Sequence, residues 1–221
     1  MAADEPDVSE AEWKAWRKAV FGDPYMVWHD GADLRCLRAP VERDLPKVDR
    51  QLVAGLRAHD PLAAQSIEFL AREGRLPERA AALLPDMAAV AAGEFLIRVA
   101  ETLYVLTGND SWADPIAAEL ASASFWGVRQ QAASALVLFA PTGRLVRALG
   151  QAVRDKEYLV RYHAANTLLQ YAGRNITIEN VPEIWPMITS PARGRASWLD
   201  RARWRKAAAL LTAAVPLDGA P

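Results

Sequence analysis

One nine-residue pattern occurs twice in this chain. Residues 128–136 follow the order Val-Arg-x-x-Ala-Ala-x-x-Leu, and residues 160–168 repeat it after a shift of 32 positions. The second copy places four apolar side chains on one helical face, at the spacing i, i+4, i+5 and i+8: Val160, Ala164, Ala165 and Leu168. The two alanines allow a second helix to pack closely. A helical unit repeated at this period predicts a solenoid of helical hairpins.

Helix boundary signals continue on both sides of this repeat. Asp60-Pro61 supplies an N-cap followed by a proline at the first helical position, and Pro85 is expected to kink or break its helix. Residues 174–196 hold three prolines at short spacing and are expected to be looser. We therefore predict an all-α chain, an α-solenoid of about five antiparallel hairpins, with helices at 46–58, 61–74, 77–92, 94–108, 112–121, 125–139, 142–153, 155–173 and 197–214.

The N-terminal part follows a different pattern. Ser9 and Glu12 form a capping box for a helix that continues through Val20, which we expect to cap the end of the solenoid. Asp30-Gly31 then indicates a turn between two short apolar runs, so residues 23–44 are either a short β-hairpin or an irregular arm. The expected organisation is a capping helix and arm over 1–44, the solenoid over 45–216 and a tail over 217–221.

The bulk composition excludes several classes of protein. With 52% hydrophobic and 24% charged residues the chain can bury a large core. Its net charge of −1 gives the chain as a whole no attraction for nucleic acid or anionic membranes. Cys36 is the only cysteine, which excludes an internal disulfide and a cysteine-ligated metal cluster. The sequence contains neither a secretory signal nor an apolar run of roughly 18 residues, so we expect a cytoplasmic protein that is not bound to a membrane.

No motif in the sequence indicates chemistry. His29, His59 and His163 are scattered, and none has a carboxylate or cysteine at metal-ligand spacing. A nucleophile elbow, a phosphate-binding glycine loop and a dinucleotide fingerprint are all missing. We therefore predict no catalytic residue, no metal and no cofactor.

The stretch from Arg144 to Leu149, followed by Asp155 and the Val-Arg motif at residue 160, resembles a HEAT repeat. In that family an aspartate ends the first helix, an arginine follows the valine of the second, and the two repeat as an acid–base ladder. Asp155, Arg161 and Arg129 match these positions, whereas Ser122 and Ser124 stand where an aspartate would precede Arg129. The resemblance implies an α-solenoid whose second helices line a concave groove, and it implies no chemistry.

The side chains that the core does not need predict what that groove presents. They are polar, with an aromatic residue at the hairpin tip, and suit a protein partner better than DNA. Small HEAT-like proteins of bacteria include immunity proteins, so a toxin domain is one such partner. We predict a non-enzymatic protein-binding solenoid with these partner-binding residues: Trp126, Gln130, Gln131, Ser134, Tyr162, His163, Asn166 and Gln170.

The alternative function rests on a basic and aromatic cluster near the C-terminus. Arginines alternate there with Trp198 and Trp204, a pattern that can bind a nucleic-acid backbone and stack bases. The predicted contacts are Arg195, Arg201 and Arg205. On this alternative the chain resembles the HEAT-like alkylpurine DNA glycosylases, or else the bilin lyases. A third alternative is a structural subunit whose groove holds a permanent partner.

The repeat register makes a prediction about stability. Ala164→Arg and Leu168→Asp each bury an unpaired charge at a tight helix contact, and each should destabilise the fold by about 4 kcal/mol or more. Thermal melting followed by circular dichroism measures this, and a melt like that of the wild type would show that the register is wrong.

Overall fold

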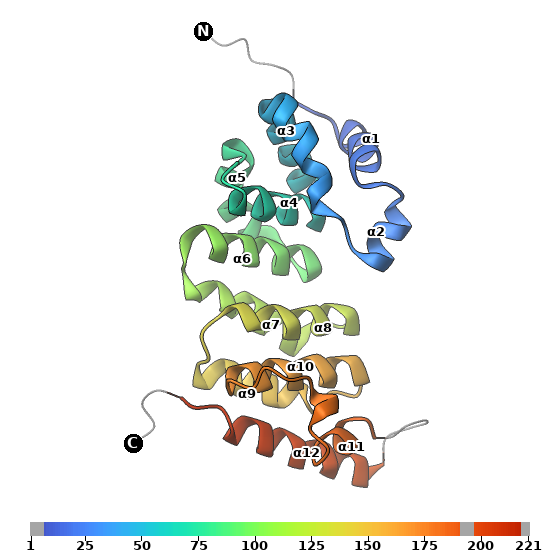
Figure 1. The fold of residues 1–221 in the computed structure, drawn as a ribbon, viewed down its shortest axis with the longest axis vertical. Coiled ribbons are helices and arrows are strands. Elements are labelled where there is room, and N and C mark those ends of the chain that lie inside the picture. The colour runs from blue at the N-terminus through green and yellow to red at the C-terminus, as the bar shows by residue number, and fades with distance from the viewer. Residues whose placement is uncertain (1–6, 191–196, 218–221) are drawn as a thin grey trace. The chain divides into compact units, whose positions relative to one another are not determined.

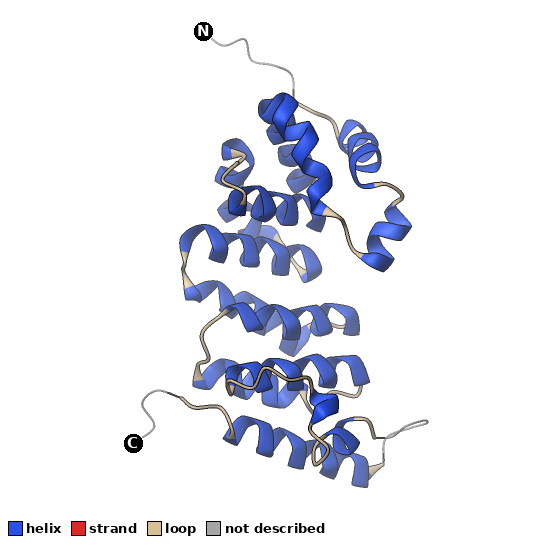
Figure 2. Cartoon of the chain, in the orientation of Figure 1, coloured by secondary structure: helices blue, strands red, loops and turns tan. Residues whose placement is uncertain are grey.

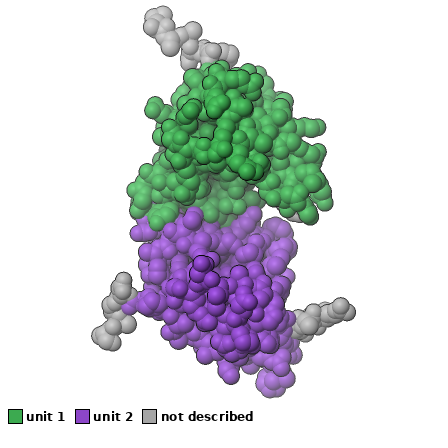
Figure 3. All heavy atoms as spheres, in the orientation of Figure 1, with its two compact units in different colours: residues 1–109 green, residues 110–221 purple. Residues whose placement is uncertain are grey.

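The computed structural model describes residues 7–190 and 197–217, without the side chain of Trp28. Within these ranges every regular element is helical (Figure 2), which confirms the all-α prediction. The chain divides into two compact units, residues 1–109 and residues 110–221 (Figure 3), so the division falls inside the segment expected to form one solenoid.

The first unit holds six α-helices and one 3-10 helix (Figure 1). Each first helix of a hairpin packs on the next first helix, α3 on α5, and each second helix on the next second helix, α4 on α6. The elements are α1 (Glu10–Phe21), α2 (Pro24–Asp30), η1 (Leu34–Leu37), α3 (Arg38–Arg57), α4 (Pro61–Arg72), α5 (Glu78–Val90) and α6 (Gly93–Thr107).

A buried tryptophan attaches the N-terminal helix to the first hairpin. Trp13 is 1% exposed, and its Nε1 donates to Oδ2 of Asp60 at 3.0 Å. The other oxygen of Asp60 accepts the backbone N–H of Leu62 and thereby caps α4. The cap of one helix is therefore also the anchor of another.

Both alternatives for residues 23–44, a short β-hairpin and an irregular arm, were wrong, because most of this segment is helical. The Asp23 side chain accepts the N–H of Tyr25, and Pro24 occupies the first position of α2, which is the normal start of a helix. The following 3-10 turn leads directly into α3, which is interrupted at Asp44 with φ −163° and ψ 80°. The Asp44 side chain caps Lys47, which explains the start signal near residue 46. The break considered at Pro85 does not occur, because α5 continues through this proline.

The second unit repeats the packing pattern of the first. The first helices α7 and α9 pack on each other, the second helices α8 and α10 do the same, and α12 packs on α9 and α10. The elements are η2 (Asp110–Trp112), α7 (Ala113–Ser122), α8 (Trp126–Ala135), η3 (Leu136–Leu138), α9 (Gly143–Ala152), α10 (Tyr158–Tyr171), η4 (Ile178–Asn180), α11 (Trp185–Ile188) and α12 (Trp198–Ala213). The repeat stripe is core: Val160, Ala164, Ala165 and Leu168 are all 0% exposed.

Gly150 has no side chain, and this lets α12 pack close to α9. A Cβ added at Gly150 would lie 2.6 Å from the Cγ2 methyl of Thr212, which is too close for any real Cβ contact. At Gly143, in the first turn of the same helix, an added Cβ would meet its nearest atom, a guanidinium nitrogen of Arg147, at 3.4 Å.

This contrast gives a matched pair of variants. Gly150→Ala should destabilise the protein by roughly 1–3 kcal/mol, because either α12 or its threonine must move. Gly143→Ala should be neutral or stabilising by about 0.4–1 kcal/mol, because it restricts only the unfolded chain. Urea denaturation measures both, and equal stability of the two variants would contradict the close approach.

Candidate binding surfaces of the second unit

The two arginines of the repeated motif make the same local contacts. The Nη1 of Arg129 donates to the carbonyls of Ala123 and Ser124 at 2.7 and 3.1 Å. The Nη1 of Arg161 donates to those of Asp155 and Lys156 at 2.8 and 2.9 Å. In both cases the carbonyls lie six and five residues before the arginine. Each arginine therefore closes the turn between the two helices of its own hairpin.

Their other contacts differ. Arg129 makes a two-pronged ion pair with Asp155 of the next hairpin, at 2.8 and 3.1 Å, and this bond raises the pKa of Arg129. Asp155 in turn accepts the N–H of Glu157 and fixes the start of α10. Asp155 therefore pairs with Arg129, the arginine of the preceding copy of the motif.

Arg161 has no carboxylate within bonding distance among the described residues, and it binds carbonyls instead. Its Nε donates to Ile188 at 2.8 Å and its Nη2 to Ser190 at 3.3 Å. Its guanidinium carbon lies 4.2 Å from the ring centre of Trp204, a cation–π contact. The side chain is 2% exposed, and burial lowers its pKa. Arg161 thereby joins the α9–α10 turn, α11 and α12.

Three of the predicted partner-binding residues form one polar network. The ring of His163 lies 3.2 Å from Nε2 of Gln130 and 2.9 Å from the hydroxyl of Ser134, so both of its nitrogens are bonded. His163 is half-buried, and desolvation lowers its pKa. The network lies between α8 and α10, and burial there favours the neutral form of the imidazole.

Two further predicted residues bind the segment that follows α10. The hydroxyl of Tyr162 donates to Glu179 at 2.8 Å, and Oδ1 of Asn166 accepts the backbone N–H of Ile178 at 2.8 Å. The ring of Trp185 meets that of Tyr162 edge to face. Residues 174–188 therefore lie against α10, a packing that the sequence analysis missed because the prolines of this segment favoured a loose loop.

The remaining predicted residues lie in different settings. Gln131 carries a buried Oε1 with no hydrogen-bond partner among the described residues, and Gln170 is exposed in the last turn of α10. Trp126 is 38% exposed at the first position of α8. Arg195 lies outside the described residues.

Trp126 belongs to a larger exposed apolar surface. Phe125 is 59% exposed beside it, with the ring centres 5.5 Å apart. One repeat later, Tyr158 and Leu159 are 38% and 39% exposed at the start of α10, which packs on α8. We call these four residues the aromatic edge. The 32-residue shift places Tyr158 at the position of Trp126, a relation that the sequence already contained.

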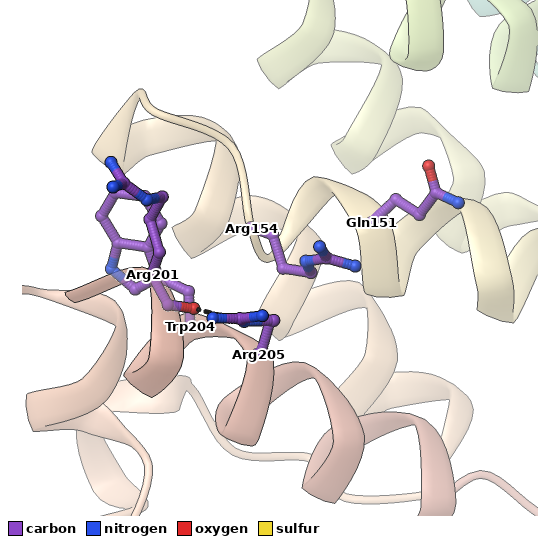
Figure 4. Close-up of a pocket in the computed structure, with 5 residues that line it drawn as sticks. All are labelled: Gln151, Arg154, Arg201, Trp204 and Arg205. Carbon is purple, nitrogen blue, oxygen red and sulfur yellow. Dashed lines mark hydrogen bonds between the residues drawn. The ribbon is translucent and has the colours of Figure 1, made fainter. Parts of the chain in front are cut away.

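The basic cluster of the sequence contributes to a pocket between α9 and α12 (Figure 4). The pocket has a volume of about 600 Å³, and three arginines line it, Arg154, Arg201 and Arg205. Gln151 and Trp204 complete the lining, which contains no carboxylate among the described residues. We call it the arginine pocket. Trp204 is 3% exposed and donates its Nε1 to the carbonyl of Ser190, so it forms part of the pocket floor and offers no free ring face.

The acid that interrupts this cluster is used within the chain. Asp200 caps α12 together with Ser197, whose N–H donates to Asp200 at 2.7 Å, and the hydroxyl of Ser190 donates to its other oxygen. These hydroxyl and backbone bonds, with that from Ser190 the strongest, lower the pKa of Asp200 to about 2. Its charge is therefore fixed at the N-terminus of α12, where the helix dipole favours it.

Metal ligation and membrane insertion find no support in the described ranges. These ranges contain no group of three or more His, Cys, Asp or Glu residues that could hold a metal ion. They also contain no helix that is long and apolar enough to span a membrane. In comparisons with protein-family models, curated proteins and solved structures, nothing matched the chain.

The lowered pKa of His163 predicts how stability depends on pH. Below the ordinary value of 6.5 the unfolded chain binds more protons at this site than the folded chain, so the free energy of unfolding falls as the pH drops. His163→Gln removes this contribution and should flatten the decline in melting temperature below pH 6.5. Parallel declines in the wild type and the variant would show that His163 does not titrate as proposed.

Proposed function

We propose that this chain is a non-enzymatic protein-binding module, built as a HEAT-like solenoid, that holds its partner through the aromatic edge of the second unit. The observation that carries the proposal is that exposed large aromatic residues recur at equivalent positions of consecutive repeats, Trp126 at the start of α8 and Tyr158 at the start of α10. Each has a second exposed apolar residue beside it in the chain, Phe125 before Trp126 and Leu159 after Tyr158.

The packing within each unit supports the HEAT-like assignment. First helices pack on first helices and second helices on second helices, α3 on α5 and α4 on α6 in one unit, α7 on α9 and α8 on α10 in the other. Equivalent threonines bridge the second helices, with Thr102 donating to the carbonyl of Ala64 and Thr167 to that of Ala133. This is the nearest-neighbour stacking of a helical repeat.

The chemistry of the aromatic edge favours a protein partner. Large aromatic side chains dominate binding energy at protein interfaces, and burying one completely contributes roughly 1.5–3 kcal/mol. The neighbouring network of Gln130, Ser134 and His163 is held by internal hydrogen bonds, so this part of the surface loses little conformational entropy on binding. Gln170 lies in the last turn of α10, so it belongs to the opposite end of the helix from Tyr158.

We propose the same class of partner that the sequence favours, namely another protein, with a toxin domain as one such partner. A toxin domain held by rigid occlusion requires a preformed surface and no chemistry, which this surface offers. The proposal assigns no catalytic residue and no cofactor.

The test is capture of the partner by the full-length protein. Tagged protein is incubated with nuclease-treated lysate of its source organism, and the protein retained in high salt is identified, purified and titrated. Trp126→Ala combined with Tyr158→Ala should weaken this binding at least about tenfold, since two aromatic anchors are lost. Leu210→Ala, at a 43%-exposed position of α12, is the matched control and should bind normally.

The results separate the alternatives. A partner that is toxic when expressed alone and is neutralised by the wild type would establish the immunity function. Normal affinity in the double variant, or an equal loss in the Leu210→Ala control, would contradict binding through the aromatic edge.

A further inference from the structure

The electric charge of the chain is unevenly distributed between its two units. Residues 110–221 carry 13 Lys and Arg against 9 Asp and Glu, a formal net charge of +4. Residues 1–109 carry 13 against 18, a net charge of −5. The value of −1 for the whole chain is therefore the sum of two net charges of opposite sign, and the argument from net charge against a polyanionic ligand does not apply to the second unit.

Within the second unit, positive charge converges on the arginine pocket. Arg154 reaches it from the turn that follows α9, and Arg205 from the second turn of α12, where its Nε donates to the carbonyl of Arg201 (Figure 4). Arg154 and Arg205 have no ion pair among the described residues. Two like charges at one pocket repel each other, and an anion between them removes that repulsion.

The two acids closest in sequence to the pocket arginines have partners that hold the fold together. Asp155, next to Arg154, is bound by Arg129 at 2.8 and 3.1 Å. Asp200 is bound by Ser190 and Ser197, and its one ion pair within the described part of the chain is a 3.7 Å contact with Arg203. The pocket is therefore positive because nearby carboxylates serve the fold.

The basic surface is larger than the arginine pocket alone. A second pocket of about 350 Å³, between α7 and α9, shares Gln151 with the arginine pocket and has Lys156 in its lining. Its one acid, Asp155, is paired with Arg129 at its base. Two adjoining pockets with basic groups form a track that suits consecutive phosphates of a chain.

An exposed aromatic ring lies one turn before this track. Trp198 is 68% exposed, and the i, i+3, i+7 spacing places Trp198, Arg201 and Arg205 on one face of α12. An exposed indole beside a basic groove stacks unpaired bases, whereas bases in a duplex already stack on each other.

We propose that the arginine pocket and the adjoining Lys156 pocket form a binding site for the phosphate backbone of single-stranded nucleic acid, with Trp198 as a platform for one base. The site is separate from the aromatic edge and requires no chemistry. Recognition is through charge and stacking, so it is tolerant of base sequence and weakens as salt rises.

The experiment measures fluorescence anisotropy of a labelled oligothymidylate titrated with the full-length protein at several salt concentrations. Arg154→Glu and Arg205→Glu should each weaken binding by about tenfold and reduce the salt dependence, because a phosphate contact is lost. Trp198→Ala should weaken binding roughly fivefold or more without changing the salt dependence. All three side chains are exposed, so we expect each variant to fold. Thermal melts of the variants check this.

Arg174→Glu is the matched control. It makes the same charge change in the same unit, but Arg174 is exposed just beyond the C-terminal end of α10, about 20 Å along the hairpin from its Arg154 end. This variant should bind nearly as the wild type does.

Several results would overturn the proposal. Arg154→Glu and Arg205→Glu could bind as the Arg174→Glu control does, or duplex DNA could bind as tightly as the single strand. Full competition by inorganic pyrophosphate, combined with normal binding by Trp198→Ala, would identify a small phosphorylated ligand instead. None of these results depends on the aromatic edge, so they leave the protein-binding proposal to its own test.

Discussion

The second unit depends on the buried guanidinium group of Arg161. It donates to two carbonyls of its own hairpin turn, to the carbonyl of Ile188 at the end of α11 and to that of Ser190 just beyond it, and it lies on the ring of Trp204. Burial of such a charge is costly unless every donor is satisfied, and carbonyl dipoles satisfy it here without a carboxylate. Because these contacts come from three separate segments, the position of α12 relative to α10 follows from one side chain.

The same arginine shows how a repeated motif can exchange one partner. Arg129, its counterpart one repeat earlier, uses its outer edge to bind Asp155 of the next hairpin. For Arg161, carbonyls of Ile188 and Ser190 take the place of the aspartate. The second copy of the motif thus keeps the inner contacts of the first and replaces only the outer partner.

Local signals in the sequence predicted most of the helices and the core stripe. The spacing of Val160, Ala164, Ala165 and Leu168 identified a fully buried face, because helical periodicity depends on neighbours along the chain. The prediction for residues 23–44 was wrong because it gave most weight to Asp30-Gly31, which favours a turn. The N-cap at Asp23 and the proline at position 24 instead start a helix. The contacts of Tyr162 with Glu179 and of Arg161 with Trp204 could not be predicted, because no periodicity connects segments joined through an irregular stretch. The arginine pocket was missed in part for the same reason: Arg154 and Arg205 meet only after α12 has packed on α9.

Gly150 gives that pocket a mechanical property. Its missing methyl lets Thr212 of α12 approach α9. Arg201 and Arg205 lie on α12, and Arg154 lies in the turn that directly follows α9. The spacing of the two helices is set by close packing, which resists change. If the pocket binds phosphates as we propose, a small anion cannot draw the helices together around it, and only the arginine side chains can adjust to its size.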